Sequence, residues 1–356
     1  MNNTVNLGGR PVGEGQPPFV IAEMSGNHNQ SLERALAIVD AAAEAGAHAL
    51  KLQTYTADTM TLDLARDEFV IDDENSLWHG ETLYQLYRKA HTPWEWHEPI
   101  FQRCRQHGLL CISSPFDATA VDFLLECGVD ALKIASFENT DLALIRKAAA
   151  TGLPLIISSG LASLAELDQA MRSAREAGCE RPILLKCTSS YPATPADANL
   201  ATLAHMRAAF ACPVGLSDHT LGIGVAVAAA ALGASVIEKH FTLSRADGGV
   251  DAAFSLQPEE LASLVQETTR AWQAIGEPCY GGGEAEQGSR RFRRSLYIVE
   301  DMRAGDILGP RNLRAIRPGF GLSPQYYETV LGMAVTRDVA RGTALTWELV
   351  KPTRGD

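Results

Sequence analysis

Residues 18–55 read PFVIAEMSGNHNQSLERALAIVDAAAEAGAHALKLQTY and contain two short apolar runs on either side of a segment with helical period. Ser31 opens the helical segment, and its hydroxyl can accept a hydrogen bond from the first helical turn. An apolar run, a turn, a helix and a second apolar run in this order predict a strand–helix–strand unit. This unit is the starting point for the rest of the chain.

The same pattern recurs along the chain and gives eight apolar runs in all. They lie at residues 18–24, 48–55, 109–116, 130–138, 154–160, 182–190, 213–219 and 235–241. Strand and helix that alternate in this way predict an α/β fold, a parallel (β/α)8 TIM barrel. A doubly wound open sheet is the structural alternative. Residues 56–92 are too long for a single strand-to-helix loop, so we expect them to fold over one end of the barrel.

The pattern breaks after Gly276, which places the barrel domain at residues 1–276. A Gly-rich polar linker is expected at 277–290, and a small, mostly β domain at 291–356. Within this last domain, residues 299–313 and 336–350 match at an offset of 37. Such an internal repeat predicts a small module with pseudo-symmetry.

The composition argues against several classes of partner. The 31 basic and 43 acidic residues give a net charge of −12, which disfavours binding to nucleic acid or to an anionic membrane. The first 17 residues are polar and resemble no signal peptide, and no apolar stretch predicts a membrane span. The seven Cys contain no CxxC pair. Reduced thiols and a cytoplasmic location are therefore expected.

Polar residues collect where the predicted strands end. Because barrel enzymes carry their chemistry at the carboxyl ends of the strands, these residues predict a site in the barrel mouth. They are Glu23, Lys51, Gln53, Ser113, Ser114, Lys133, Ser136, Glu138, Ser158, Ser159, Thr188, Ser189, Ser217, Asp218, His219, Glu238 and His240. Two inward lysines near serine hydroxyls suit a small, multiply anionic ligand such as a phosphorylated carboxylate. The alternative is that each lysine only pairs with a neighbouring glutamate.

Two imidazoles stand at the ends of the seventh and eighth predicted strands, which are neighbours in a closed barrel. His219 and His240 could share a divalent cation, of which Mn, Mg, Co or Fe is expected rather than structural zinc. Hydrogen-bonded histidines with a structural role are the alternative.

Nine motifs in order resemble the sialic acid synthase family. They are FVIAEMSGNHNQSLERA, ALKLQTY, SSPFD, LKIASFE, SSYPATP, GLSDHTLG, EKHFTLSR, RRSLYIVEDMRAGD and IRPGFG. The resemblance implies a catalytic barrel, a C-terminal antifreeze-like (SAF) domain, and condensation of phosphoenolpyruvate with an N-acylated amino sugar. The segment SRADGGVDAAFS (244–255) is most similar to the branch that makes pseudaminic acid. That branch implies 2,4-diacetamido-2,4,6-trideoxy-β-L-altropyranose as substrate, for bacterial surface glycans such as those on flagellin.

The resemblance also implies roles for single residues. Glu23, Glu138 and Asp251 match catalytic or sugar-facing positions, and His219 and His240 match the ligands of a divalent metal cation (Mn, Mg or Co). Arg317 matches an arginine that the SAF domain delivers to the barrel of a partner chain, which implies a domain-swapped homodimer. The matched substrate-binding positions are Lys51, Gln53, Ser114, Lys133, Ser136, Ser158, Ser189 and Tyr191. Ser189 stands where neuraminate synthases often carry Asn.

Three alternatives remain open on the sequence. Neuraminate and legionaminate synthases share the chemistry and differ in the amino sugar, and deoxy-octulosonate phosphate synthase is a more remote enzyme. A noncatalytic carbohydrate- or ice-binding protein built around the antifreeze-like domain belongs to another functional class. It would leave the polar residues of the barrel mouth unexplained.

Overall fold

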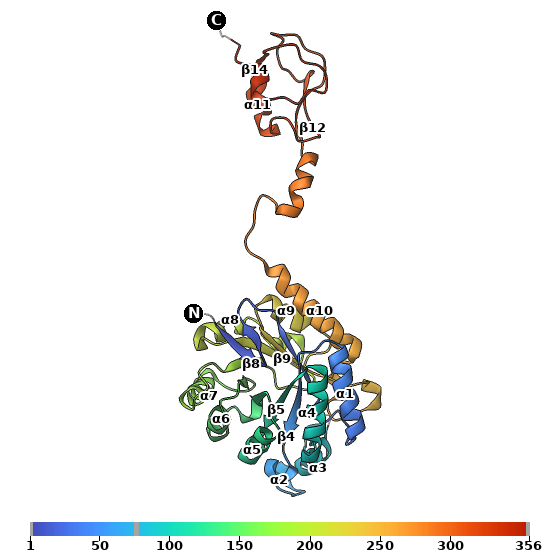
Figure 1. Cartoon of the computed structure of the whole chain (residues 1–356), viewed down its shortest axis with the longest axis vertical. Coiled ribbons are helices and arrows are strands. Elements are labelled where there is room, and N and C mark those ends of the chain that lie inside the picture. The colour runs from blue at the N-terminus through green and yellow to red at the C-terminus, as the bar shows by residue number, and fades with distance from the viewer. Residues whose placement is uncertain (1–2, 75–77, 354–356) are drawn as a thin grey trace. The chain divides into compact units, whose positions relative to one another are not determined.

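The computed structural model describes residues 3–74 and 78–353, and its larger part is a closed barrel of parallel strands (Figure 1). The strands follow one another around the barrel in chain order, and the last one pairs with the first. They are β3 (Phe19–Glu23), β4 (Ala49–Thr54), β5 (Leu110–Pro115), β6 (Ala131–Ile134), β7 (Leu155–Ser158), β8 (Ile183–Cys187), β9 (Val214–Asp218) and β10 (Val236–His240). The predicted (β/α)8 barrel is confirmed, and the open sheet was the wrong alternative.

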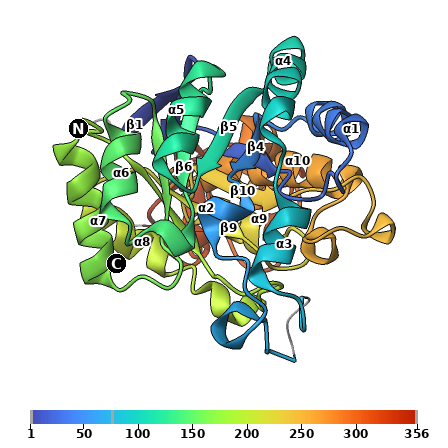
Figure 2. The ribbon, with the colours of Figure 1, turned by 90° about the horizontal axis from the view of Figure 1, so that it is seen from below.

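Helices surround the strands on the outside, as the view along the barrel in Figure 2 shows. Several begin at a side-chain cap that the sequence makes visible: Ser31, Asp117, Asp141 and Ser163 each accept hydrogen bonds from the first turn. The helices are α1 (Leu32–Glu44), α4 (His97–His107), α5 (Ala118–Glu126), α6 (Leu142–Ala149), α7 (Leu164–Glu176), α8 (Thr202–Phe210), α9 (Gly224–Ala231) and α10 (Pro258–Ile275).

Alternation along each strand divides the barrel into an outer and an inner set of side chains. The outer set, for example Leu50 and Leu52 of β4, packs against the helices in the main hydrophobic cluster. The inner set begins apolar and ends polar: on β4, Ala49 belongs to an apolar cluster inside the barrel, whereas Lys51 lines the cavity at the mouth. The change from apolar to polar along the inner face locates the site at one end.

The other end of the barrel is closed by an N-terminal hairpin, β1 (Thr4–Leu7) and β2 (Arg10–Gly13). Leu7 and Val12 are fully buried and join the apolar cluster inside the barrel. The sequence showed only a polar segment here, because the hairpin buries just two large apolar side chains among many polar ones.

The long segment between β4 and α4 folds into short elements. They are α2 (Ala57–Met60), a 3-10 turn at Asp67–Phe69, α3 (Leu83–Ala90) and a 3-10 turn at Trp94–Trp96. In Figure 2, α2 and α3 lie in front of the strands, and side chains of both helices line the cavity at the mouth. Other 3-10 turns of the barrel lie at Ser136–Glu138, Pro195–Ala198, Arg245–Asp247 and Ala252–Phe254.

Residues Glu277–Asp356 form a second compact unit, separate from Met1–Gly276. It opens with a 3-10 helix, Glu284–Phe292, which occupies part of the expected linker. It also holds β11 (Ser295–Ile298), β12 (Leu313–Ile316), β13 (Ala334–Val335), β14 (Val350–Lys351), α11 (Tyr327–Val330) and 3-10 turns at Pro324–Tyr326 and Trp347–Leu349.

The internal repeat of the second unit is visible as reciprocal pairing. The carboxylate of Asp301 accepts a hydrogen bond from the backbone N–H of Arg341 at 2.7 Å, and that of Asp338 accepts one from the N–H of Ala304 at 2.8 Å. Met302 and Val339 exchange two backbone hydrogen bonds between the copies. The two copies thus hold each other in place around one small hydrophobic cluster.

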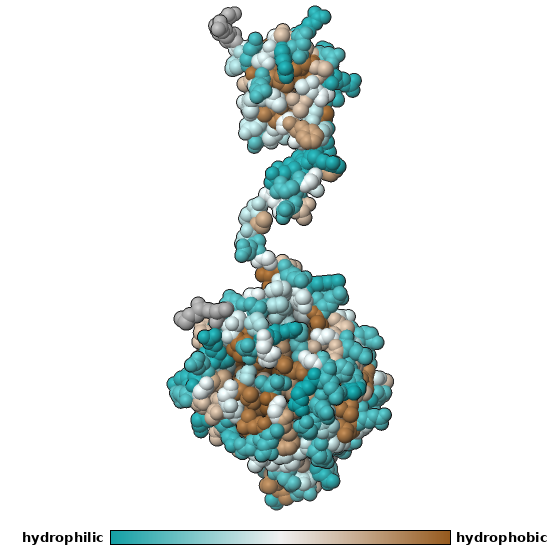
Figure 3. All heavy atoms as spheres, in the orientation of Figure 1, coloured by the Kyte–Doolittle hydropathy of each residue, from teal (hydrophilic) through white to brown (hydrophobic). Residues whose placement is uncertain are grey.

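Polar residues cover most of the surface in the view of Figure 3, and apolar residues gather in limited areas. None of the helices in the part of the chain that the structure describes has the length and apolar character needed to cross a membrane.

Candidate active site

A cavity of about 480 Å³ opens at the carboxyl ends of the barrel strands. The predicted site residues that line it are Glu23, Lys51, Gln53, Ser114, Lys133, Ser136, Glu138, Ser189, Tyr191, His219, His240 and Asp251. Ser158 is not among the lining residues, although it is buried at the end of β7. Arg317 lies in the second unit, where it is exposed after β12. The structure therefore brings most of the predicted residues together, although their roles stay predictions.

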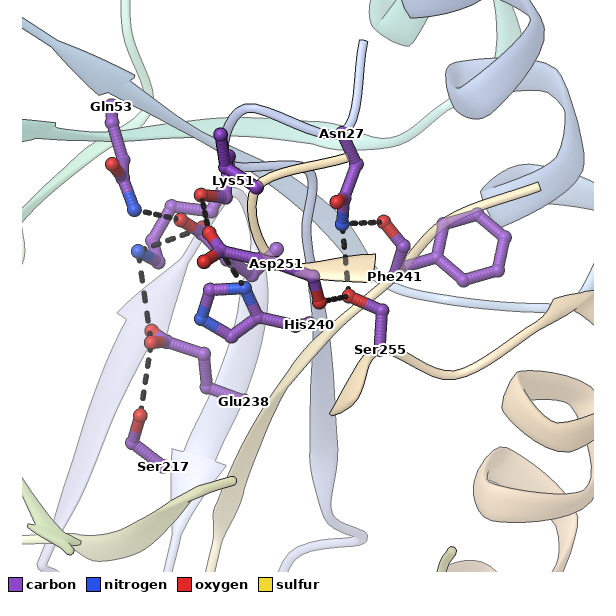
Figure 4. Close-up of polar contacts among 12 residues, drawn as sticks. Asn27, Lys51, Gln53, Ser217, Glu238, His240, Phe241, Asp251 and Ser255 are labelled. Atoms are coloured by element: carbon purple, nitrogen blue, oxygen red, sulfur yellow. Dashed lines mark hydrogen bonds and ion pairs between the residues drawn. The ribbon is translucent and has the colours of Figure 1, made fainter. Parts of the chain in front are cut away.

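Buried charges form the centre of the cavity. Lys51 Nζ lies 2.7 Å from Glu23 Oε2 and 3.6 Å from Glu238 Oε1, and Lys133 Nζ lies 3.5 Å from the same Glu238 oxygen. Figure 4 shows Lys51 and Glu238 side by side, with Ser217 donating a hydrogen bond to Glu238 at 3.1 Å. The lysines do pair with glutamates, as the sequence alternative proposed. The pairs nevertheless stay inside the cavity.

The surroundings shift the pKa values of the two glutamates of this centre in opposite directions. Burial by itself raises the pKa of Glu238, but Lys133 and Lys51 beside it hold that pKa at about 2. Burial raises the pKa of Glu23 and outweighs the effect of Lys51, and the nearby charge of Glu238 raises it further. Gln53 donates a hydrogen bond from Nε2 to Glu23 Oε1 at 2.9 Å.

Glu238 stood among the polar residues predicted at the barrel mouth, but no catalytic or binding role was assigned to it. The signal was present in the sequence, because residues two apart on a strand share a face and Glu238 precedes His240 by two. Cys187 of β8 also lines the cavity, and the sequence analysis assigned it no role there. Tyr55, Trp78 and Tyr87 line it too, but no strand pattern could place them there.

Three buried serine hydroxyls at the strand ends make no hydrogen bond of normal geometry within the described residues. They are the hydroxyls of Ser136, Ser158 and Ser189. A Cβ at Gly160 would collide with the hydroxyls of Ser136 and Ser189, so glycine lets the backbone approach them. A buried polar group without a partner is costly, which indicates that a ligand completes these bonds.

The two imidazoles lie close together, with ring centroids 5.3 Å apart. His219 Nδ1 lies 2.9 Å from the carbonyl oxygen of Thr188, which fixes the ring and leaves Nε2 available. Burial lowers the pKa of His240 well below its usual range, so this imidazole is neutral, as a metal ligand must be. Its Nδ1 is buried without a hydrogen-bond partner in the described part of the chain and lies 3.6 Å from Asp251 Oδ2.

These residues fit a divalent cation. Two imidazoles with a carboxylate nearby are a donor set that Mn, Fe or Co accepts. Residues 3–74 and 78–353 contain no group of three or more His, Cys, Asp or Glu arranged to hold a metal. The remaining ligands would therefore come from water and substrate, which leaves open positions for catalysis.

The loop after β10 carries Asp251, and a polar network ties it to the loop after β3. Asn27 donates from Nδ2 to the carbonyl oxygen of Phe241 and to Ser255 Oγ, both at 2.9 Å. Ser255 Oγ donates to the carbonyl oxygen of Asp251 at 2.7 Å (Figure 4). Ser25 Oγ donates to the Asp251 carboxylate. The contacts of Ser25 and Asn27 join residues more than 200 positions apart, and the sequence analysis assigned no role to either residue.

Comparison with known proteins agrees with the geometry. A model of the NeuB family matches residues 38–280, and a model of the SAF domain matches residues 293–351. The chain is 41% identical over 327 residues to the pseudaminic acid synthase of Campylobacter jejuni subsp. jejuni serotype O:23/36 (strain 81-176), with 92% of this chain and 95% of the relative covered. It is 41% identical over 333 residues to the pseudaminic acid synthase of Helicobacter pylori, with 93% and 97% covered.

A solved structure agrees as well. The N-acetylneuraminic acid (sialic acid) synthetase of Leptospira borgpetersenii, crystallised in complex with citrate, superposes with a TM-score of 0.71 at 33% identity. The match covers 81% of this chain and 95% of that one. The ordered motifs, the closed barrel and these relatives lead to one conclusion: the chain belongs to the NeuB family, the sialic acid synthases, and carries a SAF domain.

Proposed function

We propose that this chain is a pseudaminic acid synthase. It would condense phosphoenolpyruvate with 2,4-diacetamido-2,4,6-trideoxy-β-L-altropyranose and water to give pseudaminic acid and phosphate. The observation that carries the proposal is the composition of one cavity: two buried lysines, the buried serine hydroxyls of Ser136 and Ser189, and two neighbouring imidazoles. The identity to pseudaminic acid synthases supports this amino sugar over others.

Phosphoenolpyruvate is the ligand that the lysines and serines suit. Its phosphate and carboxylate would face Lys51 and Lys133, which now share Glu238 at 3.6 and 3.5 Å. The hydroxyls of Ser136 and Ser189, which line the cavity, would donate hydrogen bonds to this ligand. The carboxylates of Glu23 and Glu238 raise the pKa of Lys51 against the effect of burial, which favours its charged form before the substrate arrives.

The reaction forms one carbon–carbon bond and breaks one carbon–oxygen bond. C3 of phosphoenolpyruvate attacks the aldehyde carbon of the open-chain sugar, water adds to C2, and the adduct expels phosphate. The developing positive charge at C2 needs a carboxylate close by, and the captured water must lose a proton. Glu23, Glu138 and Asp251 line the cavity for these tasks. Burial raises the pKa of Glu138 to about 6, near the range in which a carboxylate exchanges protons in neutral solution.

His219 and His240 would hold a divalent cation. A cation there would polarise the sugar aldehyde toward attack. The support is the neutral state of His240, its Nδ1 without a hydrogen-bond partner in the described chain, and the carbonyl oxygen that orients His219.

Dimerisation stays a prediction. If the SAF domain of one chain delivers Arg317 to the barrel of a partner, the two defects Lys133→Met and Arg317→Ala should complement each other in mixed dimers. Both single variants are expected to be inactive, and the mixture is expected to regain activity. A fully active Arg317→Ala variant that elutes as a monomer would contradict this prediction.

The function is tested by phosphate release. The protein is incubated with phosphoenolpyruvate and, separately, with the diacetamido altrose, the diacetamido sugar of legionaminate synthesis and N-acetylmannosamine, and product masses are recorded. We expect phosphate and a nine-carbon acid with the first sugar. Lys133→Met should abolish release, whereas Lys147→Met, a surface lysine of α6 with a 40% exposed side chain, should not.

The outcomes separate the candidates. Release with N-acetylmannosamine alone would identify a neuraminate synthase, and release with the legionaminate precursor alone would identify a legionaminate synthase. If no sugar supports phosphate release, the proposed function is wrong.

A further inference from the structure

The α3 helix presents one apolar face to the active-site cavity. Leu83, Leu86, Tyr87 and Ala90 all line the cavity, and their spacing of three and four residues places them on one side of a helix. Leu86 and Ala90 are buried, each 9% exposed. Met60 and Ile71, from the same segment between β4 and α4, line the cavity next to them. We call these six residues the apolar wall.

The apolar wall is not part of a protein core. None of the three hydrophobic clusters in the described residues includes a residue of the wall. The aromatic rings of Tyr87 and Tyr55 meet edge to face at 5.7 Å, and Tyr55 continues to Phe116 at 5.1 Å, so aromatic side chains extend the wall toward the strand ends. The face borders the cavity, although α3 also packs against α2.

The segment that carries the wall is fastened in place. Trp78 donates from Nε1 to the carbonyl oxygen of Val250 at 3.1 Å. Gln30 donates from Nε2 to the carbonyl oxygens of Lys89 and His91, at 2.9 and 2.8 Å. The contacts come from the loops after β3 and β10, which also hold the site. The wall therefore has a fixed position relative to the strand ends.

The cavity thus has two ends of opposite chemistry. The strand ends supply a polar floor, made of Glu23, Lys51, Lys133, His219, Glu238 and His240. The segment between β4 and α4 supplies the apolar wall. A ligand that fills the cavity must be charged or reactive at one end and apolar at the other, because an unpaired hydroxyl buried against the wall would lose its hydrogen bonds to water.

Resting on the proposed function, we infer that the apolar wall receives the C6 methyl group of the amino sugar and selects a 6-deoxy substrate. The aldehyde carbon C1 must lie at the polar floor, where phosphoenolpyruvate and the imidazoles are. C6 is the carbon farthest from C1 in the open-chain sugar, so it points away from the floor. Leu86 and Leu83 are the specificity-determining residues that meet it.

The discrimination expected from such a wall is moderate. The side chains of Leu83 and Leu86 offer an added hydroxyl neither a hydrogen-bond partner nor a repulsive group, and an apolar pocket of this kind rejects it by up to about 100-fold. The wild-type chain should therefore prefer the 6-deoxy sugar over its 6-hydroxy counterpart by about 10- to 100-fold in kcat/KM.

The test compares these two diacetamido sugars in the phosphate-release assay. Leu86→Asn places an amide where a C6 hydroxyl would bind. We expect kcat/KM to fall for the 6-deoxy sugar and to rise for the 6-hydroxy sugar, so that the two values lie within about threefold of each other. Leu83→Asn, at a half-buried position of the same face, should act in the same direction. The KM for phosphoenolpyruvate should stay unchanged, because the polar floor is intact.

Leu62→Asn is the matched control, since Leu62 lies in the same segment between β4 and α4 and is 62% exposed. It should keep the wild-type preference. A preference that survives unchanged in both wall variants, with turnover retained, would overturn this inference and leave the proposed function standing. If Leu86→Asn fails to fold, Leu83→Asn decides alone. If none of the amino sugars supports phosphate release by the wild-type protein, both the proposed function and this inference are wrong.

Discussion

His97 offers a sharp test of how the strand ends that carry the site are held. It opens α4 and is fully buried. Its Nδ1 faces the carbonyl oxygen of Trp94 at 3.2 Å, and its Nε2 lies 2.7 Å from Thr54 Oγ1. Thr54 continues to Ser113 Oγ at 2.6 Å. The chain of hydrogen bonds thus joins the ends of β4 and β5, next to Gln53 and Ser114 of the cavity.

The pH dependence follows from the burial of this ring. Burial lowers the pKa of His97 to about 4, against 6.5 for an ordinary histidine. Because the unfolded chain binds a proton that the folded chain refuses, stability is full above pH 6.5 and is lost as the pH falls toward 4. Between pH 7 and pH 5 the loss that comes from His97 is about 2 kcal/mol of unfolding free energy.

The measurement is urea unfolding of the full chain at pH 7 and pH 5, followed by tryptophan fluorescence. In His97→Gln, the difference between the two pH values should shrink by about 2 kcal/mol. His205→Gln, at an exposed position on α8, should keep the wild-type difference. His28 and His48 also have pKa values lowered to about 4 by burial, so part of the dependence should persist. An identical difference in His97→Gln and wild type would refute the reasoning.

Three further outcomes follow from the site. Since the pKa of Glu138 is raised to about 6, its carboxylate is lost as the pH falls below that value; kcat/KM should fall in the same range, and Glu138→Gln should flatten this limb of the pH–rate profile. Glu23→Gln should lower kcat by about 100-fold or more while phosphoenolpyruvate still binds in calorimetry, and undiminished turnover would remove Glu23 from the mechanism. Dialysis against EDTA should abolish activity and Mn²⁺ should restore it, whereas full activity in protein that elemental analysis shows to be free of metal would exclude the cation.

Much of the site follows from strand periodicity. Alternation along β4 places Lys51 and Gln53 on the inner face, and consecutive strands bring His219 and His240 together. The sequence could not show Trp78 against Val250 or Asn27 against Ser255, because such contacts join loops whose paths depend on the completed fold. The helical spacing of α3 was present in the sequence, but a spacing does not reveal what a helix face covers.

The N-terminal hairpin closes one end of the barrel, so in the described part of the chain the cavity opens at the carboxyl ends of the strands. Leu7 and Val12 fill the far end with apolar side chains, so no ligand passes through the barrel. Whatever sits deepest has to enter before anything above it and leave after it. In the proposed arrangement, phosphoenolpyruvate binds at the polar floor and the sugar extends from there to the apolar wall, so phosphoenolpyruvate loads first and a sugar bound early would block its path. Initial-rate kinetics should accordingly show the amino sugar as the second substrate to bind.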